Sequence, residues 1–351
     1  MAFGSNRFGQ LMLADETDRV SPTPVGLPGT PLSMSAASKS SAVVLEEHGR
    51  LLAAGASNEG RLGFDGAGVY SSPVTVLPED ASKVALGELG GAVITREARL
   101  IIFGRCKGPN ESPAPECPIT DERMCEVACG RHHVLALDAN GSVHAMGDNR
   151  HGALGLGHRD VVAGLHRVPG LARVTSVACG RNFSLCATQD GAVYSWGADD
   201  HGALSHGKAS RWQVEPKRVE FAGERVAMVA AGDLHALALC EDGSVWSAGM
   251  GLDGQLGNGQ RDDHAAFARV PLPGPASKVS CGAGHSAALM RDGSLYLWGR
   301  GDSGQLGRGA QLESTGRRLS PVRCEALGCA VLDVALGGDH TLALVDEAKL
   351  L

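Results

Sequence analysis

The sequence predicts an all-β protein, a seven-bladed β-propeller built from four-stranded antiparallel blades. Three observations predict this fold. Glycine accounts for 49 of the 351 residues, about twice the usual share of roughly 7%, as a protein with many tight turns requires. A strand-rich repeat recurs about every 50 residues, a period typical of propellers. The last copy of the repeat breaks off at the C-terminus and continues at the N-terminus, which predicts a closed ring.

The repeat is clearest in four consecutive segments. They begin with VACGRHH, VACGRNF, VAAGDLH and VSCGAGH, and they align almost without gaps. Each segment contains an anchor glycine, and a second glycine follows it at a constant spacing. The anchors are Gly130, Gly180, Gly232 and Gly282, and the second glycines are Gly147, Gly197, Gly249 and Gly299.

Each copy has the pattern of antiparallel strands. An apolar stretch such as VTSVAC leads to the anchor glycine, and an alternating strand such as HVLALD follows. A short turn of the Asn-Gly or Asp-Gly type comes next, in DANGS, TQDGA, CEDGS and MRDGS. Such turns between alternating runs are a strong hairpin signal. A further strand such as VYSWG ends in a glycine-rich corner, and no segment shows a convincing helical period.

Weaker copies extend the repeat in both directions. Upstream, copy two has its anchor at Gly87, and a Pro-rich loop over 105–124 replaces its glycine-rich corner. Copy one has Ser38 at the anchor and Ser41 where histidine is usual. Downstream, a seventh copy begins at Gly337 and stops before its second strand pair is complete.

The two ends of the chain belong to one copy. LVDEAKLL followed by MAFGSNRFGQLML matches the template LDANGSVHAMGDNRHGALGL with one extra residue. We therefore expect a single propeller domain over residues 1–351, in which residues 1–14 complete the last blade. Closing the ring in this way removes exposed sheet edges.

Composition narrows the function classes. The net charge is −7, with no long block of one sign, so we expect no direct binding to DNA, RNA or an anionic membrane. The longest apolar runs are far too short to span a membrane, and the first residues do not resemble a signal or transit peptide. A cytoplasmic protein is the expectation, with a nuclear, ciliary or organellar complex as the alternatives. The ten cysteines contain no Cys-x-x-Cys pair, and we expect reduced thiols, most of them small buried groups.

The repeat resembles a known family. The pattern W/F-G-x-x-x-x-G-Q/A-L-G, followed by an apolar strand and A-C/A-G-x-x-H, is similar to the regulator of chromosome condensation repeat. The resemblance covers nearly the whole chain and is strongest from residue 120 onward and into residues 1–14. It implies a seven-bladed propeller. Members of that family include an exchange factor for the Ran GTPase, modules of ubiquitin ligases, a ciliary scaffold, a plant ultraviolet receptor and mitochondrial assembly factors.

No set of residues in the sequence predicts catalysis, a cofactor or a metal site. Two G-x-G-x-x-G matches, at 249–254 and 299–304, are repeat corners that lack the strand and helix of a dinucleotide site. His201 and His206 have only weak metal-ligand spacing, and four tryptophans are too few for a light receptor. A histidine also recurs at the same place after four of the anchors. We expect each to bond neighbouring backbone at a strand start; they are His133, His235, His285 and His340.

The loops between anchor glycine and histidine are the expected partner-binding surface. In the family's Ran exchange factor such loops hold the partner together with an inserted wedge, and nothing in this sequence resembles the wedge. We therefore predict a non-enzymatic protein-interaction scaffold or assembly subunit, with guanine-nucleotide exchange on a small Ras-like GTPase such as Ran as the alternative. The 105–124 loop is either a second partner surface or an unconstrained loop. Trp212, in a loop between blades, is either a partner contact or a packing residue. The expected partner-binding residues are Glu88, Arg131, His132, Arg181, Asn182, Asp233, Leu234, Asp339 and Trp212.

Overall fold

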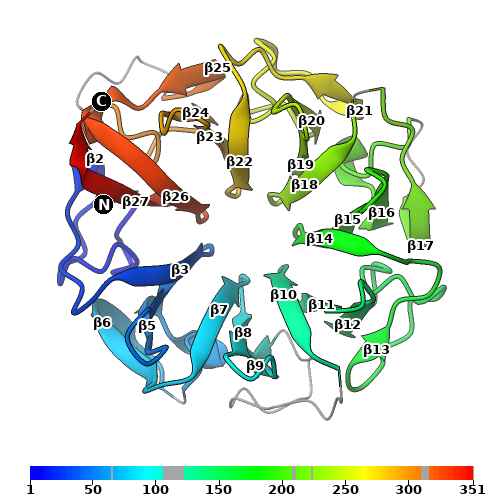
Figure 1. Cartoon of the computed structure of the whole chain (residues 1–351), viewed down its shortest axis with the longest axis horizontal. Helices are drawn as coiled ribbons and strands as arrows, with labels where there is room; N and C mark the ends of the chain where they lie inside the picture. The colour runs from blue at the N-terminus through cyan, green and yellow to red at the C-terminus, as the bar shows by residue number, and fades with distance from the viewer. Residues whose placement is uncertain (65, 106–121, 208–210, 223, 310–315, 351) are drawn as a thin grey trace.

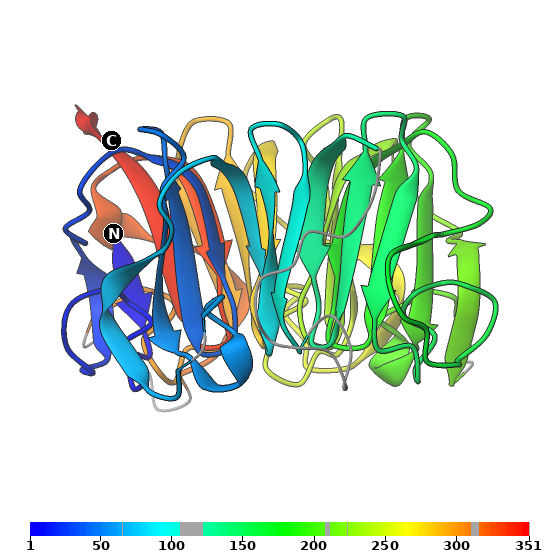
Figure 2. The same cartoon turned by 90° about the horizontal axis from the view of Figure 1, so that it is seen from below.

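A computed structural model describes residues 1–64, 66–105, 122–207, 211–222, 224–309 and 316–350. Residues 347–350 are described by their backbone alone. The chain forms seven antiparallel sheets arranged as blades around a central channel (Figure 1). Within the described residues six blades have four strands, and the second blade has three. The predicted all-β, seven-bladed fold is confirmed. Seen from the side, the blades stand next to one another, with the two chain ends at the same blade (Figure 2).

The blades are numbered here after the repeat copies. Blade 1 contains β3 (Pro31–Ala36), β4 (Ser40–Leu45), β5 (Leu51–Ala56) and β6 (Val69–Leu77), and blade 2 contains β7 (Ala81–Leu86), β8 (Gly90–Thr95) and β9 (Leu100–Gly104). Blade 3 contains β10 (Met124–Cys129), β11 (His133–Asp138), β12 (Val143–Gly147) and β13 (His166–Arg167). Blade 4 contains β14 (Val174–Cys179), β15 (Phe183–Thr188), β16 (Val193–Ala198) and β17 (Trp212–Arg218).

The other three blades follow the same order from the channel outward. Blade 5 contains β18 (Val226–Ala231), β19 (His235–Cys240), β20 (Val245–Gly249) and β21 (His264–Arg269). Blade 6 contains β22 (Ala276–Cys281), β23 (His285–Met290), β24 (Leu295–Gly299) and β25 (Arg318–Arg323). Blade 7 contains β26 (Cys329–Leu336), β27 (His340–Leu350), β1 (Ala2–Gly4) and β2 (Arg19–Thr23). Short 3₁₀ turns occur at η1 (Asn58–Gly60), η3 (Asp200–Gly202) and η4 (Glu325–Leu327).

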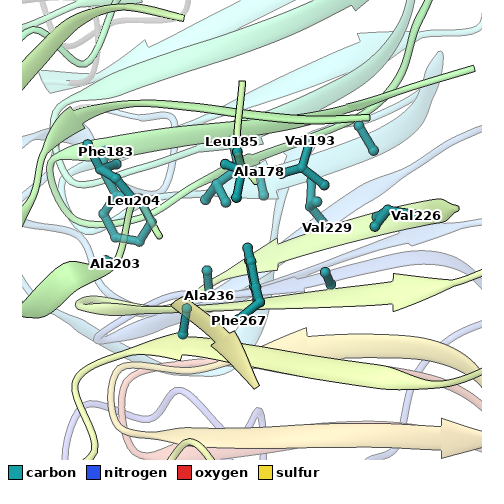
Figure 3. Packing of buried hydrophobic residues seen from close by; sticks show 14 of the residues in the cluster. Ala178, Phe183, Leu185, Val193, Ala203, Leu204, Val226, Val229, Ala236 and Phe267 are labelled. Carbon is teal, nitrogen blue, oxygen red and sulfur yellow. The ribbon is translucent and has the colours of Figure 1, made fainter. Parts of the chain in front are cut away.

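Apolar layers between neighbouring blades form the core. Phe183 and Leu185 of blade 4 belong to the same apolar cluster as Val229 and Phe267 of blade 5 (Figure 3). Full burial of side chains of this size contributes about 1.5–3 kcal/mol each. Because each blade is apolar on both sides, no blade can bury its own surface, and stability depends on an unbroken ring of seven.

The ring closes through both chain ends. β1 pairs with β27, with Phe3 opposite Thr341 and Gly4 opposite His340, and Phe3 is fully buried. The structure thus places the first residues in the last blade, as the split repeat predicts. Blade 7 also takes its outermost strand, β2, from residues 19–23, which lie beyond the 1–14 segment expected from sequence.

The register of copy one differs from the sequence-based alignment. The N–H of Ala37 donates to the carbonyl of Ser40, as the N–H of Gly130 does to the carbonyl of His133. Ala37 is therefore the anchor, rather than Ser38, and Ser40 stands where histidine is usual, rather than Ser41. The error arose because the β4–β5 hairpin, in which Ser40 pairs with Gly55, is one residue longer than the corresponding hairpin in which His133 pairs with Gly147.

In blades 3 to 7 the glycine-rich corner crosses onto the next blade. In blade 3 the N–H of Gly157 donates to the carbonyl of Val214 in β17 at 3.0 Å. Blade 7 follows the same rule, since Ala14 donates to Ser71 of blade 1 at 2.9 Å. The two G-x-G-x-x-G matches lie at such corners and form turns without a helix behind them. The corners of blades 4, 5 and 6 form the same kind of backbone bond. The N–H of Gly207 donates to the carbonyl of Ala265, that of Gly259 to the carbonyl of Leu319, and that of Gly309 to the carbonyl of Val20.

The eight cysteines in the described part of the chain form no disulfide bond; Cys106 and Cys117 lie outside it. The Sγ atoms of Cys129 and Cys179 donate to carbonyls of the preceding blade at 3.4 Å. Burial raises the pKa of the Cys186 thiol to about 12. No helix among the described residues is long and apolar enough to cross a membrane.

Candidate functional site

The seven loops that follow the innermost strands gather at one end of the channel. We call this surface the G-x-x-H face; it consists of residues 37–40, 87–90, 130–133, 180–183, 232–235, 282–285 and 337–340. In every blade one backbone hydrogen bond holds the loop. The N–H of the residue after the second glycine donates to the carbonyl of the third loop residue at 2.7–3.0 Å. The donor and acceptor residues are Ala56 and Lys39, Arg105 and Leu89, Asp148 and His132, Ala198 and Asn182, Met250 and Leu234, Arg300 and Gly284, and Ser5 and Asp339.

In four of the seven blades the last residue of the loop is a histidine that joins its blade to the next. His133 Nε2 lies 3.0 Å from the hydroxyl of Ser184, and His340 Nε2 lies 2.8 Å from that of Ser41. The same contact joins His235 to Ser286 at 2.9 Å and His285 to Thr341 at 3.2 Å. The expectation that these histidines bond neighbouring backbone does not account for the Nε2 contacts, whose partners are side chains one blade away. His133 and His285 also form hydrogen bonds with the backbone of Phe183 and His340.

The hydroxyl groups determine the protonation of the histidines. Ser184 donates its single proton to the carbonyl of Ala153 at 2.8 Å, so His133 must donate from Nε2. Complete burial lowers the pKa of His133 and His235 to about 4 and that of His340 to about 3. These neutral histidines hold the loops in place, and they are too deep to contact a partner.

A small cavity of about 90 Å³ lies where the channel opens at the G-x-x-H face. All seven blades line it, mainly through their anchor residues. Its charged lining side chains follow directly after four of the anchors; they are Glu88, Arg131, Arg181 and Asp233. The structure thus brings four of the predicted site residues together at one opening.

Three of the predicted charges are already paired within the protein. Arg131 Nε lies 3.1 Å from Glu88 Oε2 of the neighbouring blade. Asp339 Oδ1 lies 2.5 Å from a terminal nitrogen of Arg300 and 3.4 Å from the Nε2 of Gln305. Arg300 follows the second glycine of copy six, outside the loops between anchor and histidine, and was therefore not among the predicted residues.

Arg181 and Asp233 lie side by side on neighbouring blades without such a pair. The N–H of Arg181 donates to the carbonyl of Asp233 at 3.2 Å, yet neither side chain forms an ion pair within the described residues. Burial and the nearby Glu88 raise the pKa of Asp233, and Arg181, Arg300 and Arg131 oppose that rise. These two residues therefore present an arginine and a carboxylate that remain available to a partner.

Three more predicted residues lie on this face. His132, Asn182 and Leu234 are half-buried, and each is the third residue of its loop. Burial and the adjacent Arg131 lower the pKa of His132, which favours a neutral ring. Lys39 is the corresponding residue of blade 1 and is exposed, 4.7 Å from the ring of Phe8; the misplaced anchor of copy one hid it.

Trp212 lies at the rim of blade 4 and begins β17, so it does not occupy a loop as expected. It pairs with Ala198 of β16, whose N–H bonds Asn182. Asn182, Ala198 and Trp212 therefore form a row across blade 4 at the G-x-x-H end of its strands. The guanidinium carbons of Arg159 and Arg211 lie 3.8 and 4.4 Å from the centre of the indole ring.

No group of three or more potential metal ligands occurs among the residues with described positions. His201 contacts Asp263 at 2.7 Å, and His206 contacts the hydroxyl of Ser195 at 3.0 Å, so the two have different partners. Residues 106–121, most of the loop proposed as a second surface, lie outside the described residues.

Comparison with known proteins gives the family. A family model described as an RCC1-like domain matches residues 106–351. A Caenorhabditis elegans homolog of the X-linked retinitis pigmentosa GTPase regulator is 33% identical over 56% of this chain and 13% of its own length. The Arabidopsis thaliana ultraviolet-B receptor UVR8 is 29% identical over 71% of this chain and 46% of its own length. The chain thus spans less than half the length of these relatives.

Two solved structures share the fold over nearly the whole chain. Human WBSCR16 superposes with a TM-score of 0.87 at 23% identity, covering 99% of both chains. Prp20p from Saccharomyces cerevisiae superposes with a TM-score of 0.85 at 20% identity, covering 99% of this chain and 92% of that one. At this level of identity the likeness shows the fold alone.

Proposed function

Because the chain belongs to the family of RCC1-like domains, we propose that it is a non-enzymatic scaffold or assembly subunit that binds a protein partner through the G-x-x-H face. One fold serves many functions, so the proposal depends on the residues of this face. The relatives that match include regulators, a receptor and ligases, and what each of those proteins does belongs to that protein.

The observation that carries the proposal is the available pair Arg181 and Asp233 at the channel opening. Loops of rigid blades hold both residues, so little ordering is needed on binding. Arginine is enriched among the residues that dominate binding energy, and such residues cluster near the centre of an interface. The small cavity suits a protruding side chain of a partner. Its volume is well below the roughly 300–1,000 Å³ of a typical cofactor pocket.

Charge reversal tests this proposal. Partners captured by the wild-type protein from its native cell are identified by mass, and capture is repeated with Arg181→Glu/Asp233→Lys. We expect loss of capture with an unchanged far-ultraviolet circular dichroism spectrum. Reversing Arg131 or Asp339 is a less clean test, because each already pairs within this protein.

The matched control is Arg218→Glu. Arg218 is exposed and terminates β17, at the end of the strands away from the G-x-x-H face. Capture should be unchanged in this variant. If the double reversal captures every partner as well as the wild type does, the binding surface is elsewhere.

Guanine-nucleotide exchange on a small Ras-like GTPase such as Ran is the second candidate. Prp20p is described as binding Gsp1p and histones, and His132, Asp233 and Asp339 place polar groups on the corresponding face here. The scaffold proposal expects no acceleration of nucleotide release from Ran or from a panel of small GTPases. An acceleration of about a hundredfold, equivalent to about 2.7 kcal/mol of barrier, would favour the exchange factor instead.

A further inference from the structure

We propose that the partner presents an acidic segment, which lies across blade 4 from the channel opening to the rim and whose carboxylates bind Arg181, Arg159 and Arg211. This inference rests on the proposed function and specifies the chemistry of its partner. It starts from Trp212 and the two arginines beside it.

The indole ring of Trp212 holds both arginines at the surface. The guanidinium carbons of Arg159 and Arg211 lie within 4.4 Å of the ring centre, and both side chains are exposed. Arginine stacks on aromatic rings because its planar cation is weakly hydrated. Stacking leaves the N–H groups at the guanidinium edge free to bind a carboxylate with two parallel hydrogen bonds.

Two parts of the chain hold this cluster rigid. Arg159 follows the blade 3 corner, which is tied to β17 through Gly157 and Val214 at 3.0 Å. The carbonyl of Arg211 accepts a bond from the N–H of Asp199 at 3.3 Å. Because the arginines come from two blades but share one tryptophan, the cluster exists only in the folded ring.

Within the described residues no ion pair neutralises the two arginines of this cluster. Neither Arg159 nor Arg211 forms an ion pair with any carboxylate in the described part of the chain. The nearest acidic residue in sequence, Asp160, contacts His158 at 3.6 Å. Arg181 lacks an ion pair with any described residue as well, so three arginines on one blade face remain available in a protein of net charge −7.

The geometry of the blade gives the length of the ligand. Arg181 follows β14, the innermost strand, and Trp212 begins β17, the outermost. Three strand spacings of about 4.8 Å separate these strands by roughly 14 Å. An extended peptide advances about 3.3 Å per residue, so four or five residues span the distance. Binding of acidic motifs by spaced arginines is an established mode of peptide recognition.

Labelled peptides test the inference on the full chain. Fluorescence anisotropy at low salt is measured with hexaglutamate, hexaglutamine and hexalysine. We expect hexaglutamate to bind at least about tenfold more tightly than the other two, a difference of about 1.4 kcal/mol. Arg159→Gln/Arg211→Gln should weaken hexaglutamate binding by about tenfold, and Arg181→Gln should weaken it by a smaller factor.

A control variant on the same strand distinguishes an effect of this site from an effect of the protein's net charge. Arg218→Gln removes one positive charge from the other end of β17 and should leave hexaglutamate affinity within about twofold. Trp212→Leu removes the stacking surface but no charge, and it should weaken binding as well. Circular dichroism and urea midpoints of all variants verify that each is folded.

The inference is overturned if hexaglutamine binds as well as hexaglutamate, or if loss of both Arg159 and Arg211 leaves hexaglutamate affinity unchanged. These outcomes differ from failure of the proposed function. If partner capture depends on Arg181 and Asp233 while hexaglutamate does not bind, the G-x-x-H face is an interaction surface for a partner of other chemistry.

Discussion

The imidazole of His340 in blade 7 contacts the hydroxyl of Ser41 in blade 1 at 2.8 Å, although the two residues lie near opposite ends of the chain. The same contact joins three other pairs of neighbouring blades. In blade 4 the histidine position is occupied by Phe183. The hydroxyl position of blade 5, which would face it, is occupied by Ala236, which has no hydroxyl. Histidine and hydroxyl thus occur together, so the contact is a joint between blades.

Loss of this joint at the ring closure should destabilise the protein. Ser41→Ala removes the hydroxyl and leaves His340 Nε2 buried without a partner, which costs about 1–3 kcal/mol. The adjacent Ser40→Ala is the matched control, because Ser40 is equally buried but its hydroxyl has no partner among the described residues. Urea denaturation should show a lower midpoint for Ser41→Ala and a nearly unchanged midpoint for Ser40→Ala. Equal midpoints for the two variants would contradict the role of the joint.

The buried histidines should make stability depend on pH. The pKa of His133 is about 4 in the folded protein and about 6.5 when the chain is unfolded. Between these values the unfolded chain binds more protons, so stability is complete above pH 6.5 and falls as pH decreases toward 4. Each such histidine contributes up to about 1.4 kcal/mol per pH unit.

A variant in which blades 3 and 4 carry the same residue pair as blades 4 and 5 isolates this effect. His133→Phe/Ser184→Ala reproduces the Phe183 and Ala236 pair and removes one titrating group. The free energy of unfolding, measured in urea between pH 7 and 4.5, should fall less steeply for the variant than for the wild type. Identical slopes would mean that His133 is not buried neutral. The variant must be compared with the wild type, because the raised pKa values of Asp233, Asp199 and Glu126 change the free energy of unfolding with pH in the opposite direction in both proteins.

Substitution of an anchor glycine should be severe where a histidine follows. A Cβ atom at Gly232 would lie 2.3 Å from His235 Cε1 and 2.4 Å from the Gly282 carbonyl oxygen. Gly232→Ala should therefore lower the unfolding free energy by more than about 1–3 kcal/mol, the cost typical of overpacking. Gly274→Ala is a suitable control, since the nearest atom there lies 4.0 Å away. Similar melting temperatures for both variants would contradict the close approach of neighbouring blades.

Deletion of residues 1–14 should open the ring. It removes β1 from its pairing with β27, together with Phe3 and Leu11, which are fully buried. The lost apolar burial, about 1.5–3 kcal/mol for each of these side chains, is a large share of a typical stability of about 5–15 kcal/mol. We expect a much lower melting temperature or aggregation through the exposed β27 edge.

A circular permutant provides the control for this deletion. It joins Leu351 to Met1 and has its new ends in the 105–124 loop, so every strand is retained. It should fold and remain monomeric. A truncated protein that melts within about one degree of the full chain would show that β1 is dispensable.

The repeat made most of the fold predictable, and local features account for the errors. One extra residue in the β4–β5 hairpin shifted the anchor of copy one to Ser38 and concealed Lys39. The histidine contacts were missed because the hydroxyl partner lies in a different copy of the repeat, which an alignment of copies does not connect. Arg159 gave no signal of its own, because it lies in the preceding copy of the repeat, far in sequence from the Arg211 and Trp212 pair.

The amino-acid order is enough to predict the number of blades, the closure of the ring and the loops that form one face. This is so because a regular repeat period, Asp-Gly turns and a split copy are properties of the chain order. The tertiary structure alone decided which charges on that face are available. Arg131 is paired with Glu88, and Asp339 with Arg300, whereas Arg181 and Asp233 form no ion pair with any described residue. Ion pairs join side chains of different blades over a few ångströms, and such distances follow from packing rather than from residue order.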